Sequence, residues 1–297
     1  MRQRLMGSII NIFQGLAIGI ANVIPGVSGG TIAVLVGIYE QLIEALADFF
    51  SPTGKRISSL MLLSRIALGA MIGILLFTRL IDFVFSNHSL QATLFFIGLV
   101  LGSVPVLYRL SGRIRPGFPA IAAFLLAAAA VSVTGFLRPA GSDIIINTID
   151  PASAIQLFVS GFFTLATMII PGISGAFVLL AMGMYKTIVN AVNDLNILLL
   201  GIFFIGGVAG VLSLSKLIRF LLARFHHVTY FGILGLVFGS AVTLWPKEPL
   251  VLDAAGMIGI FCLLAGAALA VGLGKIKAGK QTDMQSENQT DIQANND

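Results

Sequence analysis

The sequence predicts an all-α, polytopic membrane protein with two inverted-topology repeats, each made of a re-entrant helical hairpin and three transmembrane helices. Two observations lead to this fold class. Of 297 residues, 57% are hydrophobic and 10% are charged, against about 25% charged in a soluble domain. The motif IPGVSGG at 24–30 recurs as IPGISGA at 170–176, and internal repeats of this kind are typical of secondary transporters.

Ten apolar segments, bounded by charged residues, Gly or Pro, are typical of membrane helices because each approaches the roughly 20 residues that span a bilayer. They lie at about 5–24, 30–47, 58–80, 91–108, 117–137, 153–170, 175–192, 196–219, 228–245 and 253–274. The first segment follows Arg2 and Arg4 as a signal peptide would, but no convincing small-residue cleavage site follows it. We therefore assign it to the fold.

The two halves of the chain match beyond the motif. Four residues of the first half, Gly37, Tyr39, Ala45 and Asp48, meet Gly183, Tyr185, Ala191 and Asp194 in the second. Farther on, RLIDF at 79–83 matches KLIRF at 216–220, and IGLVLGS at 97–103 matches LGLVFGS at 234–240. This alignment predicts a first membrane repeat at 1–140, a linker at 141–152 and a second repeat at 153–274. Residues 275–297 are polar and aperiodic, which predicts a disordered tail.

The number of membrane crossings in each half decides how the halves are related. Five crossings, or three if the first two segments form a hairpin, are both odd, so the second half is predicted to be upside down relative to the first. We prefer hairpins made of 5–24 with 30–47 and of 153–170 with 175–192, which leaves six crossings. The positive-inside rule then places both termini in the cytoplasm.

Composition also excludes several classes of function. The single Cys262 excludes a disulfide framework or a cysteine metal cluster, and three histidines without HExxH spacing argue against zinc. We therefore expect neither a metal nor a cofactor. The net charge of +5 does not indicate a nucleic-acid partner, because the cations lie at segment ends, where a bilayer protein needs them.

The repeated motif must interrupt a helix. Pro25 removes a backbone donor and disfavours helix before it, while Gly26 allows φ values that other residues resist. A helix that restarts near Gly30 offers free N–H groups that, with the Ser28 hydroxyl, suit an anion. The alternative is a kink that only allows close helix packing. The candidate phosphate-binding residues are Pro25, Gly26, Ser28, Gly29, Gly30, Thr31, Pro171, Gly172, Ser174 and Gly175.

A few polar residues inside the segments need separate interpretation. Arg65 lies about two turns into its segment and either pairs with phosphate or extends to the membrane interface. Glu40 and Lys186 lie about 15 Å beyond the breaks and are either solvated helix ends or, for Glu40, an ion-coupling or gating group. Asn22 lines a polar path or makes an interhelical hydrogen bond.

The doubled IPG-[VI]-SG motif followed by Gly-x-Tyr resembles the bacterial polyprenyl-phosphate transporter family over about residues 5–274. The resemblance implies a protein of the cytoplasmic membrane that returns undecaprenyl phosphate across the bilayer for reuse in cell-wall polymer synthesis. It also implies that the loops at 24–31 and 170–176 hold the phosphate. The polyprenyl-phosphate lipid would be the substrate and membrane lipids the surroundings, and a homo-oligomer is left open.

Two other functions fit the same fold. Undecaprenyl-pyrophosphate phosphatases also have paired re-entrant loops, with a PG-x-S-R-S-G signature, but the Arg position is Gly29 in one copy here and Gly175 in the other. Without that Arg the charge stabilisation that phosphoryl transfer requires is missing, so we do not expect an enzyme. A transporter of another small anion keeps the fold and changes only the cargo.

Overall fold

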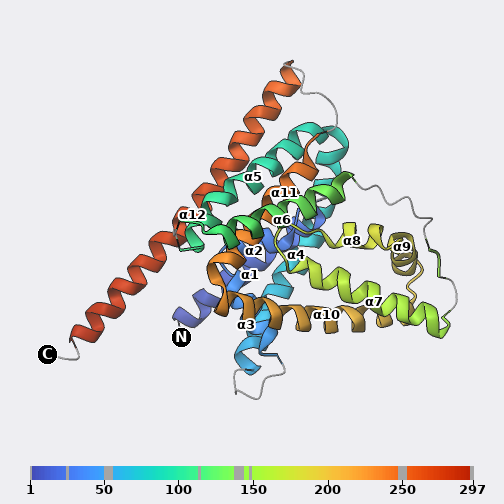
Figure 1. Ribbon diagram of the computed structural model, residues 1–297, viewed down its shortest axis with the longest axis horizontal. Helices are drawn as coiled ribbons and strands as arrows, with labels where there is room; N and C mark the ends of the chain where they lie inside the picture. Colours follow the sequence, from blue (N-terminus) through green and yellow to red (C-terminus); the bar gives the residue numbers. More distant parts are fainter. Residues whose placement is uncertain are drawn as a thin grey trace.

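The computed structural model describes residues 2–24, 27–49, 56–112, 115–136, 144–146, 149–246 and 253–294. Every regular element in this described part is a helix (Figure 1). The first half contains α1 (Arg2–Val23), α2 (Gly29–Leu35), α3 (Tyr39–Ala47), α4 (Arg56–Asn87), α5 (Ser89–Leu110) and α6 (Phe118–Phe136). The second half contains α7 (Pro151–Met168), α8 (Gly175–Ala181), α9 (Tyr185–Asn193), α10 (Ile197–Arg224), α11 (His226–Leu244) and α12 (Ala254–Ala294).

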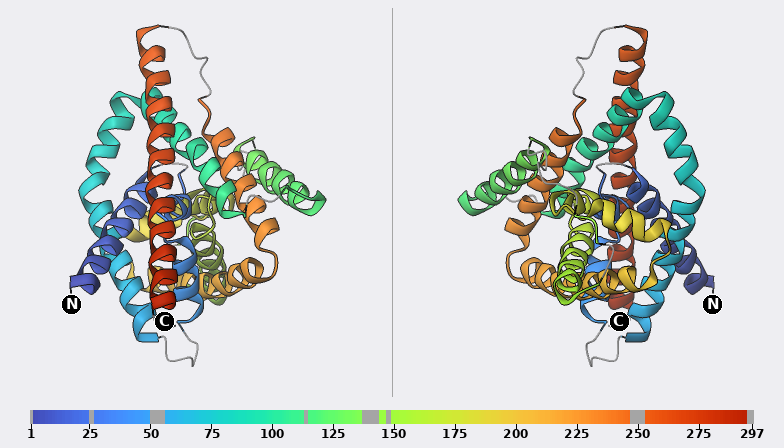
Figure 2. Two further views of the ribbon diagram at one scale, coloured as in Figure 1. Left: turned by 90° about the vertical axis from the view of Figure 1, so that its left-hand side faces the viewer. Right: turned by 90° about the vertical axis from the view of Figure 1, so that its right-hand side faces the viewer.

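Four long helix pairs hold the molecule together, and they follow one scheme in both halves. Helix α1 packs along α4 as α7 packs along α10. The last helix of each half crosses to the other half, so α12 lies along α5 and α6 lies along α11 (Figures 1 and 2). The exchange of these last helices joins the two halves into one helical body.

Glycines at equivalent positions allow these pairs to approach closely. A Cβ built on Gly69 would lie 2.0 Å from the carbonyl oxygen of Ile12, and one on Gly206 would lie 2.0 Å from that of Phe158. Similar close approaches occur in the two exchanged pairs, at Gly98, Gly102, Gly235 and Gly239. Small residues at such contacts let membrane helices pack backbone to backbone. The same interface is therefore built twice from matching sequence positions.

Five described helices are long and apolar enough to cross a membrane, namely α4, α5, α7, α10 and α12 as far as Gly274. The number rises to seven if the bent pairs α2–α3 and α8–α9 each count as one span. These findings confirm an all-helical, polytopic membrane protein. The individual spans differ from the six predicted crossings. Among the described helices α7 qualifies, α11 (predicted at 228–245) does not, and only a shorter apolar stretch of α6, Phe118–Val133, is found. Length and apolarity alone do not separate a crossing helix from one that is enclosed by protein.

The second arm of each predicted hairpin is bent rather than straight. Helices α2 and α3 meet at 118°, and α8 and α9 meet at 114°. Gly37 and Gly183 lie at the two corners with φ of 75° and 67°, a conformation that glycine adopts without steric cost. One glycine in this conformation leaves the apolar pattern intact, which is why the sequence predicts a continuous segment there.

The segments outside the membrane body also differ from expectation. Helix α12 continues past residue 274 to Ala294, where the sequence predicts a disordered tail, because extending an existing helix avoids the cost of nucleation. Helix α7 begins two residues before the predicted repeat, because Asp150 and Ser153 form a reciprocal capping box. Hydrogen bonds from Ser153 hold the pKa of the Asp150 carboxyl below its usual value. The start of α1 and the end of α12 lie toward the same end of the molecule (Figure 1).

Candidate functional site

The two copies of the repeated motif are bonded directly to each other. The Ser28 hydroxyl donates a hydrogen bond to the carbonyl of Ile170 at 3.0 Å. The backbone N–H of Gly172 donates to Thr31 Oγ1, also at 3.0 Å. Both bonds join residues more than 140 positions apart, with sequence separations of 142 and 141. The two motifs therefore meet at one place inside the molecule.

Close backbone packing supports this junction. A Cβ built on Gly30 would lie 2.9 Å from the backbone nitrogen of Pro171 and 3.0 Å from the carbonyl oxygen of Ile169. Gly172 has a φ of 88°, and a Cβ there would lie 2.5 Å from the backbone of Leu236 on α11. A side chain at Gly30 would therefore push the two motifs apart, and one at Gly172 would push the second motif away from α11.

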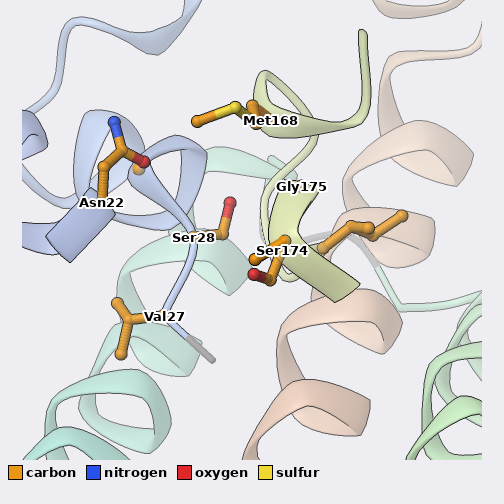
Figure 3. Close-up of a pocket in the computed structure, with 9 residues that line it drawn as sticks. Asn22, Val27, Ser28, Met168, Ser174 and Gly175 are labelled. Carbon is orange, nitrogen blue, oxygen red and sulfur yellow. The ribbon is translucent and has the colours of Figure 1, made fainter. Parts of the chain in front are cut away.

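A cavity of about 120 Å³ lies between the motifs (Figure 3). It has room for several water molecules, because one water molecule takes about 30 Å³ in the liquid. Its walls are Asn22, Val27, Ser28, Gly29, Met168, Ile173, Ser174, Gly175 and Ala176. Four residues proposed from the sequence as phosphate ligands, Ser28, Gly29, Ser174 and Gly175, thus share one cavity. Gly30, Thr31, Pro171 and Gly172 do not line it but join the motifs, whereas Pro25 and Gly26 lie outside the described residues.

The walls contain one pair of equivalent residues that the motif does not include. Asn22 on α1 and Met168 on α7 occupy the same position in the two halves and lie over the motif glycines. A Cβ on Gly29 would lie 2.5 Å from Asn22 Oδ1, and one on Gly175 would lie 2.6 Å from Met168 Cγ. The sequence indicates Asn22 only as a polar residue of a helix and gives no signal for Met168, because the two residue types differ. The cavity therefore has an amide on one side and a thioether on the other.

The two serines have different bonding. Ser28 Oγ donates to Ile170 and accepts from the Gly30 N–H at 3.2 Å. Within the described residues the Ser174 hydroxyl makes no hydrogen bond, and it lies on the cavity side of its loop (Figure 3). The N–H groups of Gly175 and Ala176 are likewise without a protein acceptor in the described part. These groups leave hydrogen-bond donors available at the wall formed by the second motif.

The predicted charge partners lie elsewhere. Arg65 is half-buried on α4 and is not part of the cavity wall. Glu40 lies in the first turn of α3, where its Oε1 accepts a hydrogen bond from the Tyr230 hydroxyl and lies 3.9 Å from His226 Nε2. Among the described residues, the cavity wall therefore contains no charged side chain. An anion there would be held by neutral donors, and the helices α2 and α8 have only seven residues each, too few to provide much of a helix dipole.

Comparison with known proteins agrees with the repeated motifs. The chain is 33% identical over 265 residues to a polyprenyl-phosphate transporter of Vibrio cholerae, covering 84% of this chain and 82% of that protein. It is 31% identical over 282 residues to a polyprenyl-phosphate transporter of Staphylococcus aureus, covering 91% of this chain and 97% of that protein. No solved structure gives a significant match. Residues 18–258 match the VCA0040-like family, described as undecaprenyl phosphate translocase-like.

This match covers both motifs, all residues of the cavity between them, and the helix pairs α7–α10 and α6–α11 in full. The resemblance drawn from the doubled IPG-[VI]-SG motif is therefore confirmed. The matched relatives are transporters rather than enzymes, in agreement with the absence of the phosphatase arginine at Gly29 and Gly175. The chain belongs to the undecaprenyl phosphate translocase-like family.

Proposed function

We propose that this protein transports polyprenyl phosphate and binds its phosphate group in the cavity between the two motifs. The observation that carries the proposal is the composition of that cavity, whose walls are equivalent residues from both halves, including Ser28 with Ser174 and Gly29 with Gly175. A site shared by two repeats is the arrangement expected of a transporter whose substrate is reached in turn from either side.

The donors around the cavity suit a phosphate oxygen. The Ser174 hydroxyl and the backbone N–H groups of Gly175 and Ala176 come from one wall, and the Asn22 amide comes from the other. Phosphate is a strong acceptor, and backbone N–H groups with hydroxyls bind it without a fixed cation. Neutral hydrogen bonds exchange readily, so the site would release its cargo after each transfer. Arg65 and Glu40 do not contact the phosphate in this arrangement.

The membrane orientation follows from the same reasoning. Two repeats of opposite orientation would bring the two motifs together near the middle of a hydrocarbon layer about 30 Å thick. Non-helical backbone at that depth is stable only inside protein or beside a watery cavity. The prenyl chain can remain in lipid, so only the phosphate head needs shelter. We propose a cytoplasmic membrane location, cytoplasmic termini and net return of the lipid to the cytoplasmic leaflet.

The test is a vesicle assay with purified protein and polyprenyl phosphate. A phosphatase that cannot cross the bilayer is added outside, and release of phosphate from the inner leaflet reports movement of the lipid. Wild-type protein should make nearly all of the lipid accessible, whereas Gly175→Val, which fills the cavity, should leave about half of it protected. Gly232→Ala is the matched control, because a Cβ there would meet nothing within 4 Å.

The enzymatic alternative is tested with the same preparation. Polyprenyl pyrophosphate is supplied without added phosphatase, and inorganic phosphate is measured. Release of phosphate that depends on Ser28 or Ser174 would contradict the proposal. Unchanged lipid movement in a folded Gly175→Val variant would show that the motifs are packing elements only.

A further inference from the structure

The two halves have the same helices but pack differently around α3 and α9. Helix α3 contacts α4 of its own half and also α10 of the other half. The equivalent helix α9 contacts α10 of its own half, but within the described residues it makes no comparable contact with α4. All seven residues of α2 are buried, whereas in α8 the buried residues are Gly175 and Leu179. The molecule is therefore closed around α3 and more open around α9.

Specific polar contacts join α3 to the other half on the closed side. Asp48, at the end of α3, forms an ion pair with Arg219 of α10. Glu40, at the start of α3, accepts a hydrogen bond from Tyr230 of α11. His226 Nε2 lies 3.9 Å from the same carboxylate. Both ends of α3 are therefore fastened across the boundary between the halves.

The corresponding positions on the open side have a different charge pattern. In the repeat alignment Asp48 matches Asp194, and Arg219 matches Asp82, because RLIDF at 79–83 aligns with KLIRF at 216–220. An acid faces a base on the closed side, whereas two acids would face each other if α9 approached α4. Asp82 and Asp194 are both exposed. Like charges brought together oppose contact, and opposite charges favour it.

The linker adds a second difference on the open side. The Ile144 N–H donates to the Gly183 carbonyl at 2.9 Å, and the Thr187 hydroxyl donates to the Ile144 carbonyl. The Ile146 N–H in turn donates to Thr187 Oγ1 at 3.3 Å. These bonds fasten the described linker residues to the corner between α8 and α9.

We propose that Asp48 and Arg219 form a transport gate that is closed in this structure, and that Asp82 and Asp194 are its counterpart on the opposite side. The inference rests on the proposed function, because a gate has meaning only for a cavity that is reached from two sides in turn. Repulsion between Asp82 and Asp194 keeps the second gate open while the ion pair holds the first one closed. Asp82 and Arg219 therefore determine which side of the membrane reaches the cavity.

The gate can be tested by substitutions that change the charge of its residues. Asp82→Arg should let α4 pair with Asp194 and close the open side, and Asp48→Asn should release the closed side. The reporter is Ala176→Cys in a Cys262→Ala background, since Ala176 is exposed and lines the cavity. Vesicles of each orientation are treated outside with a charged maleimide that cannot cross the bilayer.

Without a gate mutation, the reporter should react from one face only. Asp82→Arg should slow labelling from that face by about tenfold, a typical size for conformational coupling, and raise it from the other face. Adding Asp194→Arg to Asp82→Arg is the matched control, because two cations restore the repulsion and the original face of labelling. Both positions are exposed, so these variants are expected to fold even if Asp48→Asn does not.

Lipid movement is measured on the same vesicles to separate the two proposals. If Asp82→Arg moves the labelling to the other face although wild-type protein carries no polyprenyl phosphate, the gate stands and the proposed function fails. If wild-type protein carries the lipid and Asp82→Arg leaves the labelled face unchanged, the gate is overturned. Labelling that changes equally in the doubly substituted protein also overturns it, because the effect then does not depend on pairing.

Discussion

Replacing Gly30 with alanine tests whether the two motifs must touch. The new Cβ would lie 2.9 to 3.0 Å from backbone atoms of Ile169, Ile170 and Pro171, and backbone cannot swing aside as the end of a side chain can. Overpacking of this kind typically costs about 1–3 kcal/mol. If the motifs separate, the bonds from Ser28 to Ile170 and from Gly172 to Thr31 are lost as well, at about 0.5–1.5 kcal/mol each.

The expected loss in the free energy of unfolding is therefore about 2–6 kcal/mol. It is measured as a fall in the melting temperature of the purified protein in detergent, together with loss of lipid movement in vesicles. Gly29→Ala is the control, because its Cβ would meet the side chain of Asn22, which can rotate away. The reasoning is refuted if Gly30→Ala has the same melting temperature as Gly29→Ala and moves lipid as fast as the wild-type protein.

Three further predictions test the packing and the cavity. Gly206→Ala should lower the melting temperature strongly, because its Cβ would lie 2.0 Å from the Phe158 carbonyl oxygen. Gly201→Ala should not, because its Cβ would meet nothing within 4 Å. Equal melting temperatures of the two variants would contradict the close packing of α7 against α10. Asn22→Asp should slow lipid movement by at least about tenfold, since a carboxylate in the wall repels phosphate, whereas Met168→Leu should slow it much less. Lipid movement is measured in the vesicle assay, and equal rates for the two variants would contradict a phosphate beside Asn22. Ser28→Ala should lower the melting temperature by removing the hydrogen bonds with Ile170 and Gly30. Ser174→Ala should leave the melting temperature unchanged and weaken transport. The reverse pattern would contradict a structural role for the Ser28 hydroxyl and a phosphate-binding role for the Ser174 hydroxyl.

The sequence by itself determined the helical membrane class, the two-fold repetition and the family. Apolar content and the near absence of charge are local properties, so they identify membrane helices without knowledge of their neighbours. The breaks at the motifs were also predictable, since Pro25 and Pro171 act on their own backbone and on the residue before them. Because the motif is repeated, equivalent positions such as Ser28 and Ser174 could be named from the sequence as candidates for one shared site.

Only the tertiary structure decided how those pieces meet. The bends at Gly37 and Gly183 depend on single φ angles that leave the apolar pattern unchanged. The exchange of α6 and α12 between the halves depends on which backbones can approach at glycine contacts, and periodicity does not specify a partner. The sequence alignment pairs Asp48 with Asp194 as equals, yet Asp48 has an ion-pair partner in Arg219 while α9, which ends beside Asp194, makes no comparable contact with α4 in the described part. The alignment also sets Arg219 against Asp82, but only the long-range packing shows that Arg219 faces Asp48.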